Sequence, residues 1–184
     1  GAFLCLNNYL PSLKINNMKR ICIPLFAFFA LISGASAQDK PSSPSATATG
    51  KIGASNIKIV YCQPSARGRK IMDELVPFGE VWRTGANAAT TIQIDAPIKI
   101  EGKDLAVGKY SLFTIPNKTE WTLIINKESN QWGAFNYNDK FDLFRVSAKP
   151  SKSPAFVETF NISIGKDEIV LTWENTRVAF KVKG

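Results

Sequence analysis

The stretch KYSLFTIPNKTEWTLIIN, residues 109–126, decides the fold class of this chain. It contains two runs rich in aromatic and β-branched residues, and turn-forming residues lie between them at Pro116–Thr119. Such runs fit the pleated, half-buried surface of a sheet, and turn residues at their ends mark them as separate strands. The stretch therefore predicts two β-strands joined by a short loop.

The same pattern of short strands and turns extends from this stretch toward both ends of the chain. Further strand-like runs cover residues 57–61, two parts of 91–100 separated by Ala96-Pro97, 141–148 and 156–164. Short strands separated by turns are typical of sandwiches and barrels. Only Gly68–Leu75 has a helical pattern. We therefore expect an all-β fold, an antiparallel β-sandwich or jelly-roll-like domain with one short helix.

The C-terminal run predicts a hairpin whose two-residue loop is Asn175-Thr176. In this register Glu174 lies opposite Arg177, and the apolar pairs are Trp173 with Val178, Leu171 with Phe180 and Ile169 with Val182. All apolar partners then share one face, as the two-residue period of a strand requires. The pair of Glu174 and Arg177 would contribute roughly 0.2–1 kcal/mol across the strands.

The N-terminal part of the chain predicts export. A positively charged start at Met18-Lys19-Arg20 precedes the run Ile21–Ile32, which is apolar but shorter than a membrane-spanning helix. Ala35-Ser36-Ala37 then has the small residues of a cleavage site. This order is that of a secretory signal peptide. We expect residues 18–37 to be removed, leaving a periplasmic or secreted protein without a membrane span.

The chain is accordingly divided into four parts. Residues 1–17 precede Met18 and are interpreted as an upstream extension that is not native. Residues 38–50 are rich in Pro, Ser, Thr and Ala and are expected to be a flexible leader. Residues 51–184 should form a single β-sandwich domain, because the roughly 147 residues left after cleavage suit one domain with a sizeable core.

Composition excludes several kinds of catalytic and metal site. The chain has no histidine, which excludes a Ser-His-Asp triad, a Cys–His pair and a histidine-based zinc site. Cleavage leaves Cys62 as the only cysteine, which excludes an internal disulfide and a cysteine-rich metal cluster. No P-loop or dinucleotide-binding glycine motif occurs. We therefore expect no catalytic triad, no metal and no cofactor.

Charge argues against nucleic acid as a partner. Loss of Lys14, Lys19 and Arg20 leaves 20 basic and 15 acidic residues, a formal charge of +5 instead of the +8 of the whole chain. No run of Lys and Arg is longer than two residues, so the polybasic patch typical of nucleic-acid binders is missing.

The segment from Tyr61 to Thr91 is the candidate functional region, because it does not alternate as the strands around it do. A long irregular connection on a regular scaffold often carries function. Arginine side chains hold carboxylate or phosphate groups bidentately. We expect a ligand site made of Arg69, Arg83, Thr84 and Asn87, with Trp82 as an apolar wall. The alternative is that the arginines brace their own connection by bonding its carbonyl groups and nearby carboxylates.

Four ordered motifs carry a resemblance to a known family. They are YCQPSARGRKI at 61–71, LVPFGEVWRTGANAAT at 75–90, GKYSLFTIP at 108–116 and WENTRV at 173–178. Together they resemble the family called domain of unknown function 2911, over essentially all of residues 45–183. The resemblance implies a secreted β-sandwich-like protein of gram-negative bacteria and no particular activity. It also adds Asn175 and Arg177 to the candidate ligand-binding positions.

Three classes of function are consistent with the sequence. The first is non-catalytic binding of a small anionic or carbohydrate-like ligand, or of an envelope component. The second is a carboxylate-dependent glycan hydrolase, which needs two carboxylates about 5–10 Å apart across a cleft. The third is a structural protein-interaction module that uses an exposed apolar patch or an open sheet edge. Whether the protein is an enzyme, and its oligomeric state, are left open.

Overall fold

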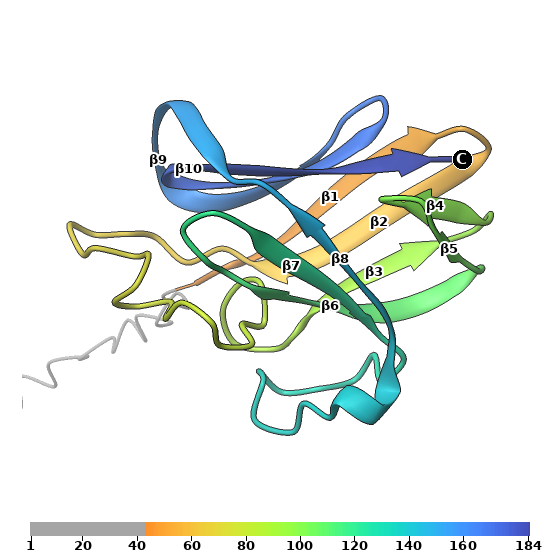
Figure 1. The fold of residues 1–184 in the computed structure, drawn as a ribbon, viewed down its shortest axis with the longest axis horizontal. Helices are drawn as coiled ribbons and strands as arrows, with labels where there is room; N and C mark the ends of the chain where they lie inside the picture. The colour runs from red at the N-terminus through yellow and green to blue at the C-terminus, as the bar shows by residue number, and fades with distance from the viewer. Residues whose placement is uncertain (1–42) are drawn as a thin grey trace, which may run out of the picture. The chain divides into compact units, whose positions relative to one another are not determined.

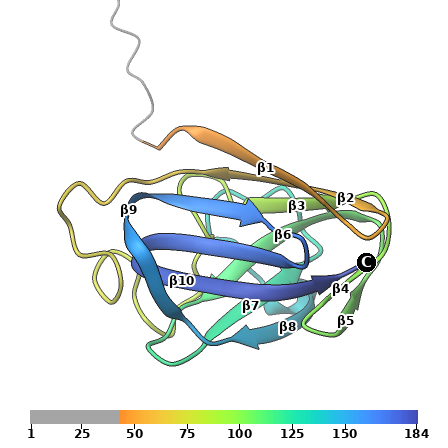
Figure 2. The same ribbon diagram turned by 90° about the horizontal axis from the view of Figure 1, so that it is seen from above.

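The computed structural model describes residues 43–184, so the expected upstream extension and signal peptide lie outside the described residues. This part of the chain forms two antiparallel β-sheets (Figures 1 and 2). The larger sheet has the order β1-β2-β3-β6-β7-β8, with bounds Ser45–Ile52, Ser55–Cys62, Thr90–Ile94, Gly108–Ile115, Trp121–Asn126 and Asp142–Ala148. The smaller sheet has the order β5-β4-β10-β9, with bounds Lys103–Leu105, Ile98–Ile100, Glu168–Lys183 and Ser151–Ile164. The expected all-β sandwich is confirmed.

The main core lies between the two sheets because one side of most strands is apolar. In β2, Ile57 and Ile59 are buried whereas Lys58 between them is exposed. Phe160 of β9 and Phe180 of β10 belong to the same buried cluster, so both sheets contribute to one core. Figure 1 shows β9 and β10 lying over the larger sheet. This arrangement follows from the period of two, which places alternate side chains on opposite faces.

The predicted strands within residues 109–126 are confirmed as β6 and β7. They pair antiparallel from Ser111 opposite Asn126 to Ile115 opposite Thr122. Their alternate side chains are buried on both faces, because Phe113 and Ile124 form a second, smaller apolar cluster with Ala89. Ala134 and Tyr137, from the connection that follows β7, pack against this second cluster. The connection after β7 therefore covers part of the outer face of the larger sheet.

The predicted hairpin at Asn175-Thr176 is wrong, because residues 168–183 form one strand, β10, that pairs with β9. The pairing has register shifts on either side of Glu174, whose φ of 49° lies in the left-handed region. A bulge adds a residue to one strand and moves the following side chains to the other face. Buried positions accordingly change from Ile169, Leu171 and Trp173 to Val178, Phe180 and Val182. A hairpin and a bulged strand predict the same apolar pattern, so the pattern alone could not separate them.

The expectation of a flexible leader over residues 38–50 is wrong from residue 45 onward, since Ser45–Ile52 forms β1, while residues 38–42 lie outside the described residues. β1 pairs with β2 from Ser45 opposite Cys62 to Ile52 opposite Ser55. The sequence shows little apolar period here because the partly buried positions are Ala46, Ala48 and Gly50. A Cβ atom at Gly50 would lie 2.5 Å from Cγ2 of Ile164, so the small residue allows β1 to approach β9.

The short helix expected at Gly68–Leu75 is also wrong. This segment forms turns, in which the Val76 amide donates to the Ile71 carbonyl at 2.9 Å. Asp73 has a φ of 71°, which interrupts any helical path. The described residues have a single helical turn, the 3-10 turn η1 at Asp139–Phe141. Within residues 43–184 we find no helix with the length and apolar character needed to cross a membrane.

Candidate functional site

The connection between β2 and β3, residues 63–89, is attached to both sheets. Ser65 forms a bridge to Thr159 of β9, and Trp82 forms a bridge to Thr114 of β6. The Ala66 amide donates to the Glu158 carbonyl at 2.8 Å, and the Trp82 amide donates to the Thr114 carbonyl at 2.7 Å. Figure 1 shows this long loop at the end of the sandwich. The connection is thus an ordered part of the domain, fixed at two points by backbone hydrogen bonds.

The backbone of this connection is strained at several positions. Four of its non-glycine residues have positive φ: Arg67, Asp73, Thr84 and Asn87, at 53°, 71°, 55° and 58°. For a β-branched residue such as Thr84 this conformation is a true outlier. Asp and Asn adopt this region readily in turns, so the strain is clearest at Thr84, where it costs on the order of 1–3 kcal/mol; such strain is concentrated at binding and active sites. The positive φ angles in this connection therefore favour a functional role for the cavity that it borders.

A pocket of about 360 Å³ lies between this connection and the start of the described chain. Three arginines line it, namely Arg67, Arg69 and Arg83. Its apolar side is formed mainly by Trp82 and Trp173, together with Leu75, Val76 and Pro64. No described Asp or Glu lines this pocket. The lining therefore combines a concentration of positive charge with an aromatic wall.

Two of the pocket arginines are held in place by carbonyl groups of their own connection. Arg69 Nε donates to the Ala66 carbonyl at 3.0 Å, and its Nη2 donates to the Ser65 carbonyl at 2.8 Å. Arg83 Nη1 donates to the Asn87 carbonyl at 3.2 Å, and its guanidinium carbon lies 5.5 Å from the centre of the Phe135 ring. A guanidinium has five N–H donors, so each side chain is oriented while keeping donors for a ligand.

Ring contacts and hydrogen bonds also hold the two tryptophans of the aromatic wall, Trp82 and Trp173, in place. The rings of Trp82 and Trp173 are stacked, with centres 6.0 Å apart and planes 17° apart. Trp82 also makes edge contacts with Trp121 and Phe160. The indole N–H of Trp82 donates to the Gly85 carbonyl at 3.1 Å, and that of Trp173 donates to the Glu158 carbonyl at 3.2 Å. With its indole N–H satisfied, the partly exposed Trp82 presents apolar surface to the pocket, and the buried Trp173, 2% exposed, supports it from behind.

Four of the predicted site residues line this pocket: Arg69, Trp82, Arg83 and Asn87. Asn87 Nδ2 donates to the Ser43 carbonyl at 3.3 Å, which links the pocket to the first described residues. Thr84 does not line it, because its side chain is buried, with Oγ1 3.0 Å from Thr114 Oγ1. Thr84 also accepts at its carbonyl from Thr90 Oγ1 at 2.7 Å. Its role in the structure is to support the strained turn behind the pocket.

Asn175 and Arg177, the positions added by the family resemblance, lie outside the pocket lining. Asn175 is exposed, and Arg177 Nη2 is paired with Glu168 Oε1 at 2.7 Å. The WENTRV motif still meets the connection through its first two residues. Trp173 lines the pocket, and Glu174 Oε1 accepts from the Ile71 amide at 3.3 Å. Sequence reasoning missed Trp173 as a site residue because its alternation with Leu171 is that of an ordinary core position.

A second cavity of about 170 Å³ adjoins the pocket. Both cavities are bordered by Leu75, Val76, Trp82 and Arg83. The other residues that line the second cavity are Pro77, Glu80, Val81 and Ala134. Ala134 comes from the connection between β7 and β8, residues 127–141, which therefore takes part in the site.

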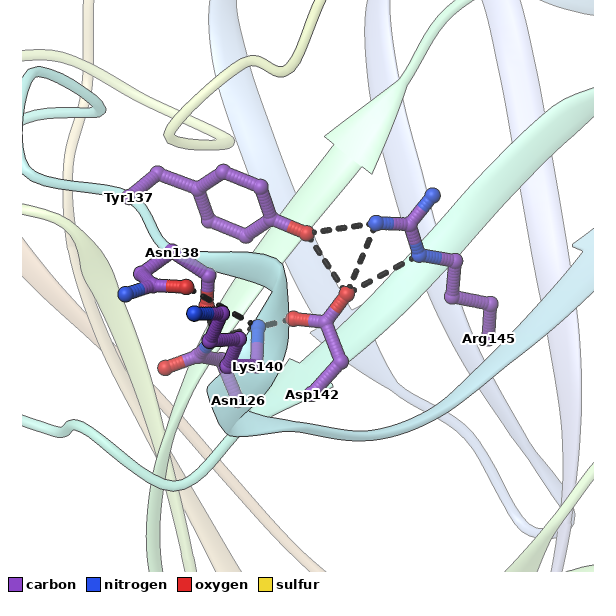
Figure 3. Close-up of polar contacts among 6 residues, drawn as sticks. All are labelled: Asn126, Tyr137, Asn138, Lys140, Asp142 and Arg145. Atoms are coloured by element: carbon purple, nitrogen blue, oxygen red, sulfur yellow. Dashed lines mark hydrogen bonds and ion pairs between the residues drawn. The ribbon is translucent and has the colours of Figure 1, made fainter.

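A polar cluster anchors this connection to β8 (Figure 3). Tyr137 Oη donates to Asp142 Oδ2 at 2.6 Å, and Arg145 Nη2 donates to both Tyr137 Oη and Asp142 Oδ2 at 2.8 Å. Asn126 Nδ2 donates to Asp142 Oδ1 at 2.9 Å and to the Asn138 carbonyl at 3.1 Å. Burial, and then the hydrogen bond to the Asp142 carboxylate and its negative charge, raise the pKa of Tyr137. The hydrogen bond to Asp142 also raises the pKa of Arg145.

Across the described residues no cluster of three or more His, Cys, Asp and Glu side chains could hold a metal ion. Cys62 is a free, partly buried thiol in that part of the chain.

Comparison with known proteins gives one match. The model of the family described as "Protein of unknown function (DUF2911)" matches residues 43–182, which include every element of the two sheets except the last residue of β10. No curated protein and no solved structure matches the chain.

Proposed function

The chain belongs to the DUF2911 family, and because that description carries no activity, we propose a function from the pocket itself: the domain binds a small anionic ligand without transforming it. The arginines of the pocket provide the binding groups, and Trp82 and Trp173 provide an apolar wall. The observation that carries the proposal is the lining of the pocket, which has three arginines and no described carboxylate.

The charge of the lining supports this choice. Arg69 and Arg83 border the same cavity, and no Asp or Glu is among its described lining residues. Arg67 also borders it, and its backbone amide donates to Glu158 Oε1 at 2.7 Å. A carboxylate or phosphate bound in the cavity would accept bidentate hydrogen bonds from guanidinium groups.

The bracing of Arg69 and Arg83 supports binding as well. Three carbonyl groups fix the two side chains before any ligand arrives. Binding groups that are already oriented lose little conformational entropy when the ligand binds. Bracing and binding, which the sequence presents as alternatives, are therefore compatible for these two residues.

The test is a titration of the purified protein with inorganic phosphate and with acetate, followed by intrinsic tryptophan fluorescence. Trp82 and Trp173 line the pocket, so occupancy should change their emission. A charge-assisted hydrogen bond contributes about 1.5–3 kcal/mol, so Arg69→Gln and Arg83→Gln should each weaken binding by roughly tenfold to a hundredfold. High salt should weaken it further.

Arg177→Gln is the matched control, because it removes one arginine that is paired with Glu168 outside the pocket. It should leave the affinity unchanged. Saturable binding that is equally weakened by all three substitutions would mean that overall charge, and not this pocket, attracts the anion. No saturable change with either anion would refute the proposed function.

The glycan hydrolase hypothesis receives less support from the same pocket. Hydrolysis needs a pair of carboxylates flanking the scissile bond. Among the described residues, Glu80 is the one carboxylate at either of the two adjoining cavities, and it borders the smaller one. A single carboxylate offers a proton donor or a nucleophile but not both, so binding is the better proposal.

The interaction-module hypothesis rests on a different observation. Trp132, Phe135, Phe141 and Leu143 are large apolar side chains with substantial exposure, and all four lie within the segment 132–143. Exposed apolar side chains that are grouped in this way are typical of protein contact surfaces. Size-exclusion chromatography and cross-linking of a periplasmic extract test this candidate, and a purely monomeric protein with no cross-linked product would count against it.

We also propose that the domain acts outside the cytoplasm, on the basis of the signal-peptide pattern at residues 18–37. N-terminal sequencing of protein recovered from a gram-negative host should find a chain that starts at Gln38. A chain that keeps Met18 would refute the proposed export.

A further inference from the structure

Resting on the proposed function, we propose that the ligand is an amphipathic organic anion. Its carboxylate or phosphate group binds at the pocket arginines, and its apolar chain extends past Arg83 into the second cavity beside Ala134.

The first observation is that the two cavities share walls. Leu75, Val76, Trp82 and Arg83 border both of them. The shared wall is apolar apart from Arg83, and the proposed apolar chain would follow this wall from one cavity to the other. A free inorganic anion would leave the apolar side chains of the shared wall uncovered and the second cavity empty.

The second observation is the difference in chemistry between the two cavities. The first holds three arginines, whereas the residues found in the second cavity alone include Pro77, Val81 and Ala134. Glu80 also borders the second cavity, where its negative charge would disfavour a second anionic group. The charged end of a ligand is therefore directed to the first cavity and the apolar end to the second.

The third observation is that Arg83 is held at the boundary. Its guanidinium donates to the Asn87 carbonyl on one side and lies against Phe135 on the other. A Cβ atom at Gly133 would lie 3.0 Å from Arg83 Nη1, so the glycine lets residues 133–135 approach the guanidinium closely. Fixed in this way, Arg83 presents its charge to the anionic group while leaving the neighbouring apolar wall open.

The fourth observation is the exposure of apolar side chains beside this path. Leu75 is 44% exposed although it borders both cavities, and Phe135 is 78% exposed although it follows Ala134 directly. Large apolar side chains left exposed at the rim of a cavity favour an apolar ligand, which gains free energy by covering them.

The size of the second cavity sets the length of the chain. A methylene group takes about the volume of one water molecule, about 30 Å³ in the liquid, so a 170 Å³ cavity holds roughly five or six. Each buried methylene should tighten binding about threefold to fourfold. The affinity should therefore rise along a series of straight-chain anions and level off once the second cavity is filled.

The experiment is a titration of the purified protein with acetate, butanoate, hexanoate and octanoate. A parallel arm uses inorganic phosphate and alkyl phosphates of the same lengths. We expect the affinity to rise with chain length in at least one arm, and the arm with the tighter binding identifies the charged group. Ala134→Leu fills the second cavity and should abolish the rise while leaving the affinity for acetate or phosphate unchanged.

Ala155→Leu, at an exposed position of β9 that lines neither cavity, is the matched control and should keep the rise. Where Ala134→Leu fails to fold, Val81→Met offers a second way to fill the same cavity. Short anions that bind with an affinity independent of chain length would overturn this inference and leave the proposed function intact. A rise that persists in the filled variants would also overturn it, and failure of every anion to bind would overturn both.

Discussion

Arg83 offers the sharpest test of how the site is built, because its two contacts can be removed separately. Arg83→Met keeps most of the aliphatic stem and removes the guanidinium. It therefore deletes the hydrogen bond to the Asn87 carbonyl and the contact with the Phe135 ring. Phe135→Leu removes the ring alone and keeps an apolar side chain at that position.

The magnitude follows from the geometry. The hydrogen bond from the Arg83 guanidinium to the Asn87 carbonyl should contribute about 1 kcal/mol, less than a short charge-assisted bond, because 3.2 Å is at the long end of hydrogen-bond distances. The cation–π contact, at 5.5 Å from a ring that is 78% exposed, belongs at the weak end of its range, about 0.5 kcal/mol. Arg83→Met should thus lower the free energy of unfolding by about 1.5 kcal/mol and Phe135→Leu by about 0.5 kcal/mol. The coupling in the double variant should be about 0.5 kcal/mol.

The assay is urea unfolding of the four proteins in the double-mutant cycle. With an m-value of about 2 kcal/mol per molar, Arg83→Met should lower the midpoint by roughly 0.7 M. A loss well above 2 kcal/mol would show that Arg83 is part of the scaffold and would refute its role as an oriented binding group. A coupling near zero would refute the idea that Phe135 helps to hold the guanidinium.

Three further predictions concern pH and packing. Because the pKa of Tyr137 is raised, its contribution to stability is present below about pH 10 and is lost as the pH rises through the folded-state value. The free energy of unfolding, measured with urea, should therefore fall more steeply in wild type than in Tyr137→Phe between about pH 9 and pH 11, the window around the ordinary tyrosine pKa. Equal slopes of stability against pH in the two proteins would contradict this. The hydrogen bonds from Asn56 lower the pKa of Asp95, so its contribution is present above the ordinary value of 3.8 and is lost as the pH falls through the folded-state value. As the pH falls, the free energy of unfolding should accordingly decrease less steeply in Asp95→Asn than in wild type. Equal slopes would argue against a stabilising hydrogen bond between Asn56 and the Asp95 carboxylate. Gly50→Val would force a side chain against Ile164 and should cost about 1–3 kcal/mol in thermal unfolding, whereas Thr49→Val, at an exposed neighbouring position, should be nearly neutral.

Strands with a clear local pattern could be predicted from the sequence. β6 and β7 have β-branched and aromatic residues bounded by turn residues, so the residues of each strand are sufficient to predict it. β1 was missed because its partly buried positions are alanine and glycine, which carry no apolar signal even though Gly50 is needed for contact with Ile164. The form of β10 was missed because the alternation of buried residues does not reveal which strand is the partner.

The candidate site could be predicted only in part, for a related reason. Arg69, Trp82, Arg83 and Asn87 are close in sequence, so a single segment pointed to all of them. Trp173 lines the same pocket but is far from these residues in sequence, and β10 is positioned by its pairing with β9. Local sequence patterns do not predict which strands pair. Thr84 is predicted as a site residue with its neighbours Arg83 and Asn87, but its backbone is left-handed and its buried side chain bonds Thr114.

The attachment of the connection after β2 to both sheets has a consequence for motion within the domain. Arg69 bonds the carbonyls of residues 65 and 66, which are themselves tied to β9, whereas Arg83 follows Trp82, which is tied to β6. A ligand held by both arginines would act as a clamp between the two layers of the sandwich. Amide hydrogen exchange in β9 and β6 should then slow together when the pocket is filled, although neither strand supplies an arginine to it.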